Sequence, residues 1–543
     1  MQNETIEWWR KGTIYQVYPR SFSDSSNRGW GDLNGVRERL PYLASLGVDA
    51  VWISPFFKSP MKDFGYDVED HRCVDPMFGT NEDFDALIAE ARRLNIKIMV
   101  DLVLSHVSDI HPWFKEASKS RDSEYSDCFV WADAQVDGSP PNNWRAIFGG
   151  SAWTWSPSRR QYYLHNFLKS QPDLNFHNPR VRQEALSIAR YWLDKGVSGF
   201  RLDTVNFYFH DQELRSNPAS DCVGDNMAHE SNPYSYQDHI YDKNRPEVSS
   251  FLAELGAVLK EYPGAVTLGE VGAVKKRSWA LVREYTQENR LSLCYNFDLL
   301  GEDFDANYLR SVIEQSSREA PDAWPCWTFS NHDVPRSASR LAKAGARQDQ
   351  VASLSTALLL SLRGTPCIYQ GEELGLEEAE IAYEDLKDPF GIEFWPDIPG
   401  RDGCRTPMPW TEKDPNCGFN DGKKTWLPIP DAHRSLSVEV QEPVYDSSLN
   451  RFRRLLAMRS QETALQIGDL DLLDSDGEVL AYERSFDGEA IQCYFNLSSE
   501  PKSLEVPGFQ DSRVFDGSTP TWQDAPAGLD LEPWGWVWLR KPS

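Results

Sequence analysis

The alternation of short strand-like runs with amphipathic helical segments constrains the fold of this chain most. The runs are rich in β-branched and aromatic residues, and a 3.6-residue hydrophobic period fills the stretches between them. A doubly wound open sheet would usually carry a Gly-rich phosphate-binding turn after its first strand, and the sequence shows none there. The pattern therefore predicts an α/β fold, a (β/α)₈ barrel, whose strands are expected at Thr13–Tyr18, Ala50–Ser54, Lys97–Val103, Ser198–Asp203, Val266–Glu270, Leu291–Phe297, Ala323–Ser330 and Pro366–Gln370.

Two connections are too long to be ordinary loops. One follows the third strand, from Ser108 to about Asn178, and the other follows the eighth, from Gly371 to about Ser448. Insertions of this kind lie at the C-terminal face of a barrel, where active sites are built. From about Leu465 the pattern changes to alternation, which predicts antiparallel strands. We therefore expect barrel segments at 1–107 and 179–464, an inserted subdomain at 108–178, a second insertion at about 371–448 and a C-terminal β domain at 465–543.

The composition narrows the class of protein. With 83 acidic against 56 basic residues the formal charge is −27, which disfavours nucleic acid and anionic membranes as partners. The nine cysteines are scattered without CxxC spacing, which argues against a zinc site or a disulfide framework. No run approaches the roughly 18 apolar residues of a membrane-spanning helix, and no signal peptide is visible. We expect a soluble cytoplasmic protein, monomeric or homodimeric.

Ionisable residues gather where the predicted strands end. Catalytic residues of barrel enzymes come from the C-terminal ends of several strands, so these positions are candidates for one shared site. A single acidic residue beside an arginine would more often be a structural salt bridge. Several such ends together favour an active site, and the residues concerned are Asp101, His106, Arg201, Asp203, Glu270, His332 and Asp333.

Two of these carboxyl groups have different surroundings. Arg201 and Asp203 occupy alternate positions of a strand and therefore project to the same side, where the guanidinium favours an ionised Asp203. Glu270 follows five neutral residues, a setting that raises a carboxyl pKa and suits a general acid. One ionised and one protonated carboxyl group around a single bond is the usual arrangement for glycoside hydrolysis.

Longer motifs that point to the same kind of enzyme occur over nearly the whole chain. They are Trp8-Trp9, Tyr15-Gln-Val-Tyr-Pro-Arg-Ser-Phe22, Gly65-Tyr-Asp67, Asp101 with His106, Gln171-Pro-Asp-Leu-Asn175, Gly199-Phe-Arg-Leu-Asp203, Gly269-Glu270, Asn331-His-Asp333 and Gly400-Arg-Asp-Gly-Cys-Arg-Thr-Pro-Met-Pro-Trp410. Together they resemble the α-amylase superfamily, glycoside hydrolase family 13. Within it they are most similar to the branch of bacterial α-glucosidases and oligo-1,6-glucosidases.

The resemblance implies an exo-acting, retaining α-glucosidase without a required cofactor. Its substrate would be a short oligosaccharide or glucoside, from whose non-reducing end it releases α-glucose. Asp203 would be the nucleophile, Glu270 the acid/base, and Asp333 the carboxylate that stabilises the transition state. Further substrate contacts are implied for His106, Arg201 and His332 at the reacting sugar, Asp63 and Arg405 as closure of the pocket, Tyr66 as a stacking platform, and Phe148, Phe167 and Phe297 around the sugar and its leaving group.

Thr204, which follows the predicted nucleophile, bears on linkage preference. In this branch valine at that position accompanies cleavage of α-1,6 bonds, and threonine or alanine accompanies a preference for α-1,4 bonds. The resemblance thus implies maltose, and sucrose as a further candidate, with transglucosylation at high sugar concentration. A sucrose or trehalose isomerase and a dedicated α-glucosyltransferase on the same scaffold remain alternatives. A non-catalytic relative would be expected to lose the carboxylates.

Two departures from the family concern metal ions. Many relatives bind a divalent ion in the loop after the first strand, where this chain has Asp24 and Asp32 with Arg28 between them. A cation does not belong among the oxygen ligands of a hard metal ion, so we expect the Arg28 guanidinium to replace the ion. Ser105 stands where many amylases have a calcium-binding asparagine. We therefore predict no metal site.

Overall fold

A computed structural model shows eight parallel strands in one sheet, in the order β11-β10-β9-β5-β2-β1-β13-β12. A parallel bridge between Cys294 in β11 and Pro325, just before β12, joins the two edges and closes a barrel. Every predicted barrel strand coincides with one of these strands, so the α/β barrel prediction is confirmed. The strands are β1 (Ile14–Val17), β2 (Ala50–Ile53), β5 (Lys97–Leu102), β9 (Gly199–Leu202), β10 (Val266–Val271), β11 (Leu293–Asn296), β12 (Cys326–Trp327) and β13 (Thr365–Tyr369).

The structure describes residues 6–221, 223, 228–273, 275–342, 346–506, 513–517, 521–522 and 528–541. Cys222 and the first five residues, on which the cysteine and signal-peptide predictions partly rest, lie outside them. The eight described cysteines are free thiols. Within the described ranges no helix is long and apolar enough to span a bilayer.

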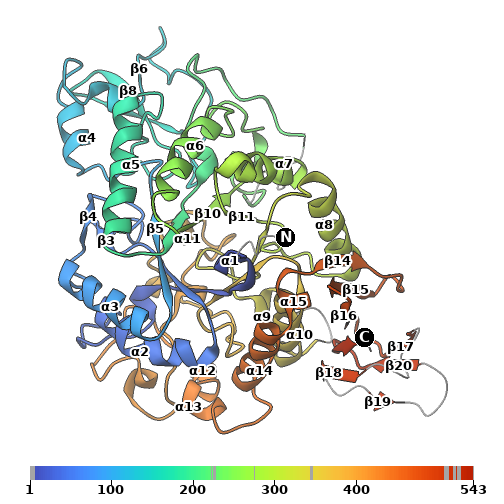
Figure 1. Cartoon of the computed structure of the whole chain (residues 1–543). Coiled ribbons are helices and arrows are strands. Elements are labelled where there is room, and N and C mark those ends of the chain that lie inside the picture. The colour runs from blue at the N-terminus through green and yellow to red at the C-terminus, as the bar shows by residue number, and fades with distance from the viewer. Residues whose placement is uncertain are drawn as a thin grey trace.

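Amphipathic helices surround the barrel (Figure 1). Their first turns carry the caps expected at helix starts: the Asp32 side chain accepts from the N–H of Gly35, and Thr80 forms a capping box with Asp83. The helices between the strands are α2 (Leu33–Leu46), α3 (Asn81–Arg93), α5 (Pro179–Asp194), α6 (Val248–Leu259), α7 (Lys275–Thr286), α8 (Ala306–Glu319) and α10 (Gln348–Ser361).

The segment between β5 and α5 forms a small unit beside the barrel, at the upper left in Figure 1. It contains α4 (Pro112–Ala117) and a three-stranded antiparallel sheet of β6 (Trp131–Ala132), β8 (Gln161–Leu164) and β7 (Trp153–Ser156). The segment after β13 contains only short helices, α11 (Pro389–Phe394), α12 (Asp431–Ser435) and α13 (Val438–Gln441), before α14 (Ser448–Gln461). The domain boundaries given above remain predictions.

An antiparallel β domain ends the chain, as predicted. Its larger sheet has the order β14-β15-β16-β21-β18, and its smaller sheet the order β17-β20-β19. Two buried arginines bind it to the barrel, because Arg459 of α14 donates to the carbonyl oxygen of Leu465 and Arg484 of β15 donates to that of Ser361. The strands are β14 (Asp469–Leu472), β15 (Val479–Phe486), β16 (Glu489–Asn496), β17 (Lys502–Glu505), β18 (Arg513–Gly517), β19 (Thr521–Trp522), β20 (Gly528–Leu531) and β21 (Trp536–Arg540).

Candidate active site

A cavity of about 190 Å³ lies at the C-terminal ends of the barrel strands. Its volume is below the roughly 300–1,000 Å³ of pockets for drug-sized ligands, so it suits a molecule of the size of a sugar ring. Ten predicted site residues line it: Asp63, Tyr66, His106, Phe148, Phe167, Asp203, Thr204, Glu270, Phe297 and Asp333. Arg201, His332 and Arg405 are buried in contact with these residues. Sequence reasoning missed Ile147, Phe207, Ala228, Tyr234, Lys243, Gly272, Phe390 and Arg401.

The guanidinium of Arg201 connects three carboxylates. Its Nη1 donates to Asp101 over 2.9 Å and to Asp203 over 2.7 Å, and its Nη2 donates to Glu270 over 2.5 Å. Asp203 therefore lies on the same side as Arg201, as the strand period predicted. The link to Glu270 was not predicted, and it places both carboxyl groups of the expected mechanism against one cation.

The two carboxyl groups have raised pKa values for the same reason. Burial raises the pKa of Glu270 to about 7 against the opposing effect of Arg201, in the direction expected for a general acid. Burial likewise raises the pKa of Asp203 to about 7. Arg201 favours the ionised form of Asp203, as predicted, but burial of the carboxyl group has the larger effect on its pKa.

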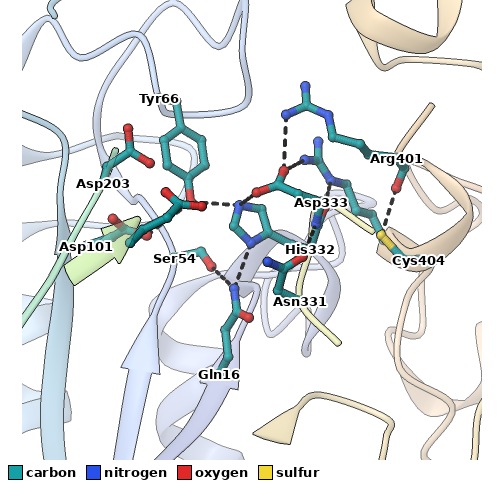
Figure 2. A network of polar contacts seen from close by, with 12 residues as sticks. Gln16, Ser54, Tyr66, Asp101, Asp203, Asn331, His332, Asp333, Arg401 and Cys404 are labelled. Carbon is teal, nitrogen blue, oxygen red and sulfur yellow. Dashed lines mark hydrogen bonds and ion pairs between the residues drawn. The ribbon is translucent and has the colours of Figure 1, made fainter. Parts of the chain in front are cut away.

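Asp333 has the opposite electrostatic setting. Burial acts to raise its pKa, but His332, Arg401 and Arg405 hold that pKa well below its usual range. Its Oδ1 accepts from Arg405 over 2.9 Å and from Arg401 over 3.2 Å, and its Oδ2 lies 3.3 Å from His332 Nε2 (Figure 2). Asp333 is therefore a carboxylate at neutral pH.

The tautomer of His332 follows from its partners. Its Nδ1 lies 2.8 Å from Nε2 of Gln16, an amide nitrogen that can only donate, so Nδ1 accepts and Nε2 carries the hydrogen. Nε2 lies 2.7 Å from the hydroxyl of Tyr66, which in turn donates to Asp101 over 3.0 Å (Figure 2). Burial lowers the pKa of His332 to about 3, so the ring is neutral. The ring of Tyr66 stacks on it at 5.4 Å and 4°.

Arg401, and not Arg405, contacts Asp63. Its Nη2 lies 3.0 Å from Asp63 Oδ1 and 2.7 Å from Asp388 Oδ1, and the carbon of its guanidinium lies 5.2 Å from the ring centre of Phe148. Arg405 lies deeper, where it donates to the carbonyl oxygen of His332 over 2.7 Å and to Asp333. The closure of the pocket by Asp63 and Arg405 that the resemblance implied stays a prediction, and Arg401 is a further cation beside Asp63. Arg401 stands in the same motif, four residues earlier, and that motif was the available signal.

Aromatic rings from both insertions meet over the cavity. Phe148 from the first insertion and Phe390 from α11 in the second make an edge contact with ring centres 5.7 Å apart. Phe167 lies 5.0 Å from the ring of His106 and 5.3 Å from that of Phe207. Phe148 and Phe167 thus line the cavity among other aromatic rings, and their contact with a sugar or its leaving group stays a prediction.

Thr204 has a strained backbone. Its φ of 41° and ψ of 52° are in the left-handed region, where a β-branched residue is a genuine outlier and costs on the order of 1–3 kcal/mol. Its hydroxyl oxygen lies 3.2 Å from Asp203 Oδ2 and 3.2 Å from the Ser105 hydroxyl. Strain of this kind clusters at functional sites, and here it brings the Thr204 hydroxyl to the expected nucleophile.

The loop after β1 satisfies its carboxylates without the Arg28 guanidinium. Asp24 accepts from the N–H of Gly29 and from the Asn420 amide, each over 2.7 Å, and Asp32 accepts from the hydroxyls of Ser25 and Ser26. The Arg28 guanidinium instead donates to the carbonyl oxygen of Pro76. The predicted replacement of an ion by Arg28 is therefore wrong: backbone N–H groups, hydroxyls and one amide bind these carboxylates.

Comparison with known proteins places this geometry in a family. The catalytic-domain model of α-amylase matches residues 16–468, and the model of the maltogenic amylase C-terminal domain matches residues 470–538. A probable α-glucosidase of Rhizobium meliloti is 53% identical, covering 92% of this chain and 91% of that protein. An oligo-1,6-glucosidase of Heyndrickxia coagulans is 36% identical over 92% of this chain and 94% of its own length.

Among solved structures, an α-glucosyl transfer enzyme superposes with a TM-score of 0.94 at 47% identity, covering 99% of this chain and 100% of that one. The barrel, the C-terminal β domain, the pocket carboxylates and these matches agree. The chain therefore belongs to glycoside hydrolase family 13, the α-amylase superfamily, alongside its α-glucosidases.

Proposed function

We propose that this chain is an exo-acting, retaining α-glucosidase that releases α-glucose from short α-1,4-linked glucosides. The observation that carries the proposal is that one small cavity contains both a pair of carboxyl groups on a shared cation and a separate ion pair. Asp203 and Glu270 share the Arg201 guanidinium, and the ion pair of Asp63 with Arg401 lies at the same cavity.

Retention is supported by the shared cation. Carboxyl groups bound to the two ends of one guanidinium lie close together, which suits the roughly 5–5.5 Å separation of retaining enzymes better than the roughly 6.5–9.5 Å of inverting ones. Asp203 attacks C1 of glucose while Glu270 gives its proton to the departing oxygen. Water then attacks C1 of the ester, Glu270 takes the water proton, and the C1–Oδ bond breaks. Asp333 stabilises the positive charge that develops on the sugar.

Exo action is supported by the contacts of Arg401. This guanidinium joins Asp63 to Asp333 at the cavity, where the three side chains form a polar wall, and buried Asp388 holds the guanidinium from behind. Such a wall can bind the hydroxyl groups of a terminal glucose, which favours cleavage at the end of a chain. Proton NMR and chromatography of a fresh hydrolysate of maltohexaose test both points: α-glucose and maltopentaose are the first products expected. Fragments of intermediate length without free glucose would contradict exo action, and newly released β-glucose would contradict retention.

The linkage preference depends on Thr204. Threonine at this position, like alanine, accompanies a preference for α-1,4 bonds in the branch that the chain resembles, and here the threonine hydroxyl lies beside Asp203. We expect kcat/KM for maltose to exceed that for isomaltose, and the opposite order would overturn this part of the proposal. The matched control is sucrose, which contains the same glucosyl group with a different leaving group.

Transfer of glucose is the second candidate function. The α-glucosyl transfer enzyme that resembles this chain over its whole length is the observation that favours it. The covalent intermediate is common to both activities, so product analysis on sucrose, maltose and trehalose separates them. Free glucose as the main product supports hydrolysis. Oligosaccharides support transfer, and an isomer of the starting disaccharide supports isomerisation.

A further inference from the structure

Lys243 is a buried cation of the pocket that the proposed reaction does not use. Its side chain is 3% exposed and lines the cavity together with Glu270. Its ammonium donates to the carbonyl oxygen of Gly272 over 3.1 Å and lies 4.6 Å from the ring centre of Phe207 and 5.1 Å from that of Tyr234. These rings attract the charge and leave the other ammonium hydrogens available to a ligand.

The position of Lys243 is fixed by the residue that follows it. The Asn206 side chain donates to Asn244 Oδ1 over 2.7 Å and to the Gly272 carbonyl oxygen over 2.8 Å, and the N–H of Asn244 donates to the Asn206 carbonyl oxygen. The ends of β9 and β10 and the segment before α6 are therefore cross-linked around the ammonium group. Such a site is preorganised, because little side-chain freedom is lost when a ligand binds.

Arg201, Arg401 and Lys243 are cations at the pocket, and of these three only Lys243 has no carboxylate partner among the described residues. Arg201 and Arg401 each contact three carboxylates, whereas no carboxylate of the described residues lies within ion-pair distance of Lys243. The carboxylate of neighbouring Asp242 binds His239 Nδ1 over 2.6 Å instead. Burial lowers the pKa of Lys243 to about 8, with Asp242 opposing, so the ammonium is still mostly charged at neutral pH.

Lys243 is bound to the segment that follows Glu270. The wall formed by Asp63, Arg401 and Asp333 accounts for the glucosyl side of the cavity in the proposed function. Gly272, which binds Lys243, comes two residues after Glu270, the residue that protonates the departing oxygen. A group carried by the leaving molecule is therefore the one within reach of the ammonium.

We propose that Lys243 binds a carboxylate on the leaving group, so that the preferred substrates join glucose to a small hydroxy acid. This inference rests on the proposed α-glucosidase function and adds the class of its aglycone. A carboxylate fits because a single ammonium without a second cation beside it in the described residues matches a single negative charge. The same contact would recruit a hydroxy acid as the acceptor in transfer: its hydroxyl oxygen attacks C1, the C1–Oδ bond to Asp203 breaks, and Glu270 takes the hydroxyl proton.

The test compares two glucosides that differ only in the carboxylate, 2-O-α-glucosylglycerate and 2-O-α-glucosylglycerol. The measurement is the ratio of their kcat/KM values, which cancels any change in the amount of folded enzyme. We expect a ratio of at least about 10 for the wild-type chain, since hydrogen bonds between charged groups are among the stronger ones in proteins. Lys243→Met keeps an unbranched stem without the charge and should bring the ratio close to 1.

Lys115→Met is the matched control, since it removes one positive charge from an exposed position of α4 and should leave the ratio unchanged. A ratio near 1 in the wild type, an unchanged ratio in Lys243→Met, or hydrolysis of maltose without hydrolysis of either glycerol derivative would each overturn the proposal. Failure of the wild type to hydrolyse maltose as well would refute the proposed function itself. The two failures are thus distinguishable.

Discussion

The backbone N–H of Thr204 donates a hydrogen bond to Oε2 of Glu270 over 3.1 Å. The same residue places its hydroxyl beside Asp203, so it connects the proposed nucleophile with the proposed acid/base. The left-handed backbone of Thr204 allows both contacts at once, and this gives a functional reason for its strain. Glycine would adopt that conformation more easily, but it has no hydroxyl to offer.

The single hydroxyl hydrogen of Thr204 has two acceptors. His106 donates from Nε2 to the Tyr66 carbonyl oxygen, so its Nδ1 must accept from the hydroxyl of Ser105. Ser105 then has no hydrogen left for Thr204 and can only accept from it. Thr204 therefore donates to Asp203 when that carboxyl is ionised, and to Ser105 when it is protonated.

Replacing Thr204 by valine should shift the acid side of the pH profile. Valine keeps the shape but removes the donor that favours ionised Asp203, so the Asp203 pKa rises and the acid limb of kcat/KM moves upward by about one pH unit. The position of the acid limb is measured from kcat/KM for 4-nitrophenyl α-glucoside between pH 4 and 9. Ser105→Ala is the control with the opposite expectation, since Thr204 then has only Asp203 to donate to. If the acid limb of kcat/KM falls at the same pH in both variants and in the wild type, the Thr204 hydroxyl does not control the pKa of Asp203.

Removing the proposed acid should affect poor and good leaving groups differently. General acid catalysis contributes roughly 10²–10⁴-fold, so Glu270→Gln should lower kcat/KM on maltose by about that factor. On 4-nitrophenyl α-glucoside, whose leaving group needs little protonation, the loss should be at least about tenfold smaller. Asp203→Asn should abolish both activities, because the nucleophile serves every substrate. An Asp203→Asn enzyme of full activity would exclude the nucleophile assignment.

The barrel and the centre of the site were predictable because they depend on local periodicity. The two-residue alternation of side chains along a strand predicted that Arg201 and Asp203 lie on one side. The predicted C-terminal ends of other strands identified Glu270 and Asp333 as candidates. The contact of Arg201 with Glu270 depends on the pairing of β9 with β10, which no local pattern encodes. The raised pKa of Asp203 is equally non-local, because it follows from burial of the carboxyl group, which depends on how neighbouring strands pack.

The outer parts of the site come from long loops, whose sequences lack the hydrophobic periodicity from which helices and strands are predicted. Arg401 contacts Asp63 across more than 300 residues of sequence, and Phe390 contacts Phe148 across more than 200. Lys243 precedes α6 in a stretch whose sequence resembles any polar connection. Only the packing of the two insertions, and of the segment between β9 and α6, over the barrel brings these side chains to the cavity.

Arg401 should matter for its shape as well as its charge. Lysine at this position keeps the charge but cannot hold Asp63, Asp333 and Asp388 together, because it lacks the planar fork of the guanidinium. Arg401→Lys should therefore lower kcat/KM on maltose by about 10–100-fold, with most of the effect in KM. Arg347→Lys, at an exposed position, is the control and should behave like the wild type. A variant Arg401→Lys with unchanged KM would show that the wall does not bind substrate.

The raised pKa of Glu270 also predicts how stability depends on pH. Burial raises that pKa from 4.5 to about 7, so the folded chain retains a proton that the unfolded chain releases within this interval. The stabilisation from this proton is complete below about pH 4.5 and is lost as the pH rises through about 7. Glu270→Gln cannot lose a proton, so it should melt a few degrees higher than the wild type at pH 8, and the difference should shrink at pH 5. Thermal unfolding at the two pH values measures this. The control is Asp349→Asn, at an exposed carboxylate, which should show no such dependence on pH. If Glu270→Gln and the wild type differ in melting temperature by the same amount at both pH values, Glu270 is not protonated in the folded enzyme at neutral pH.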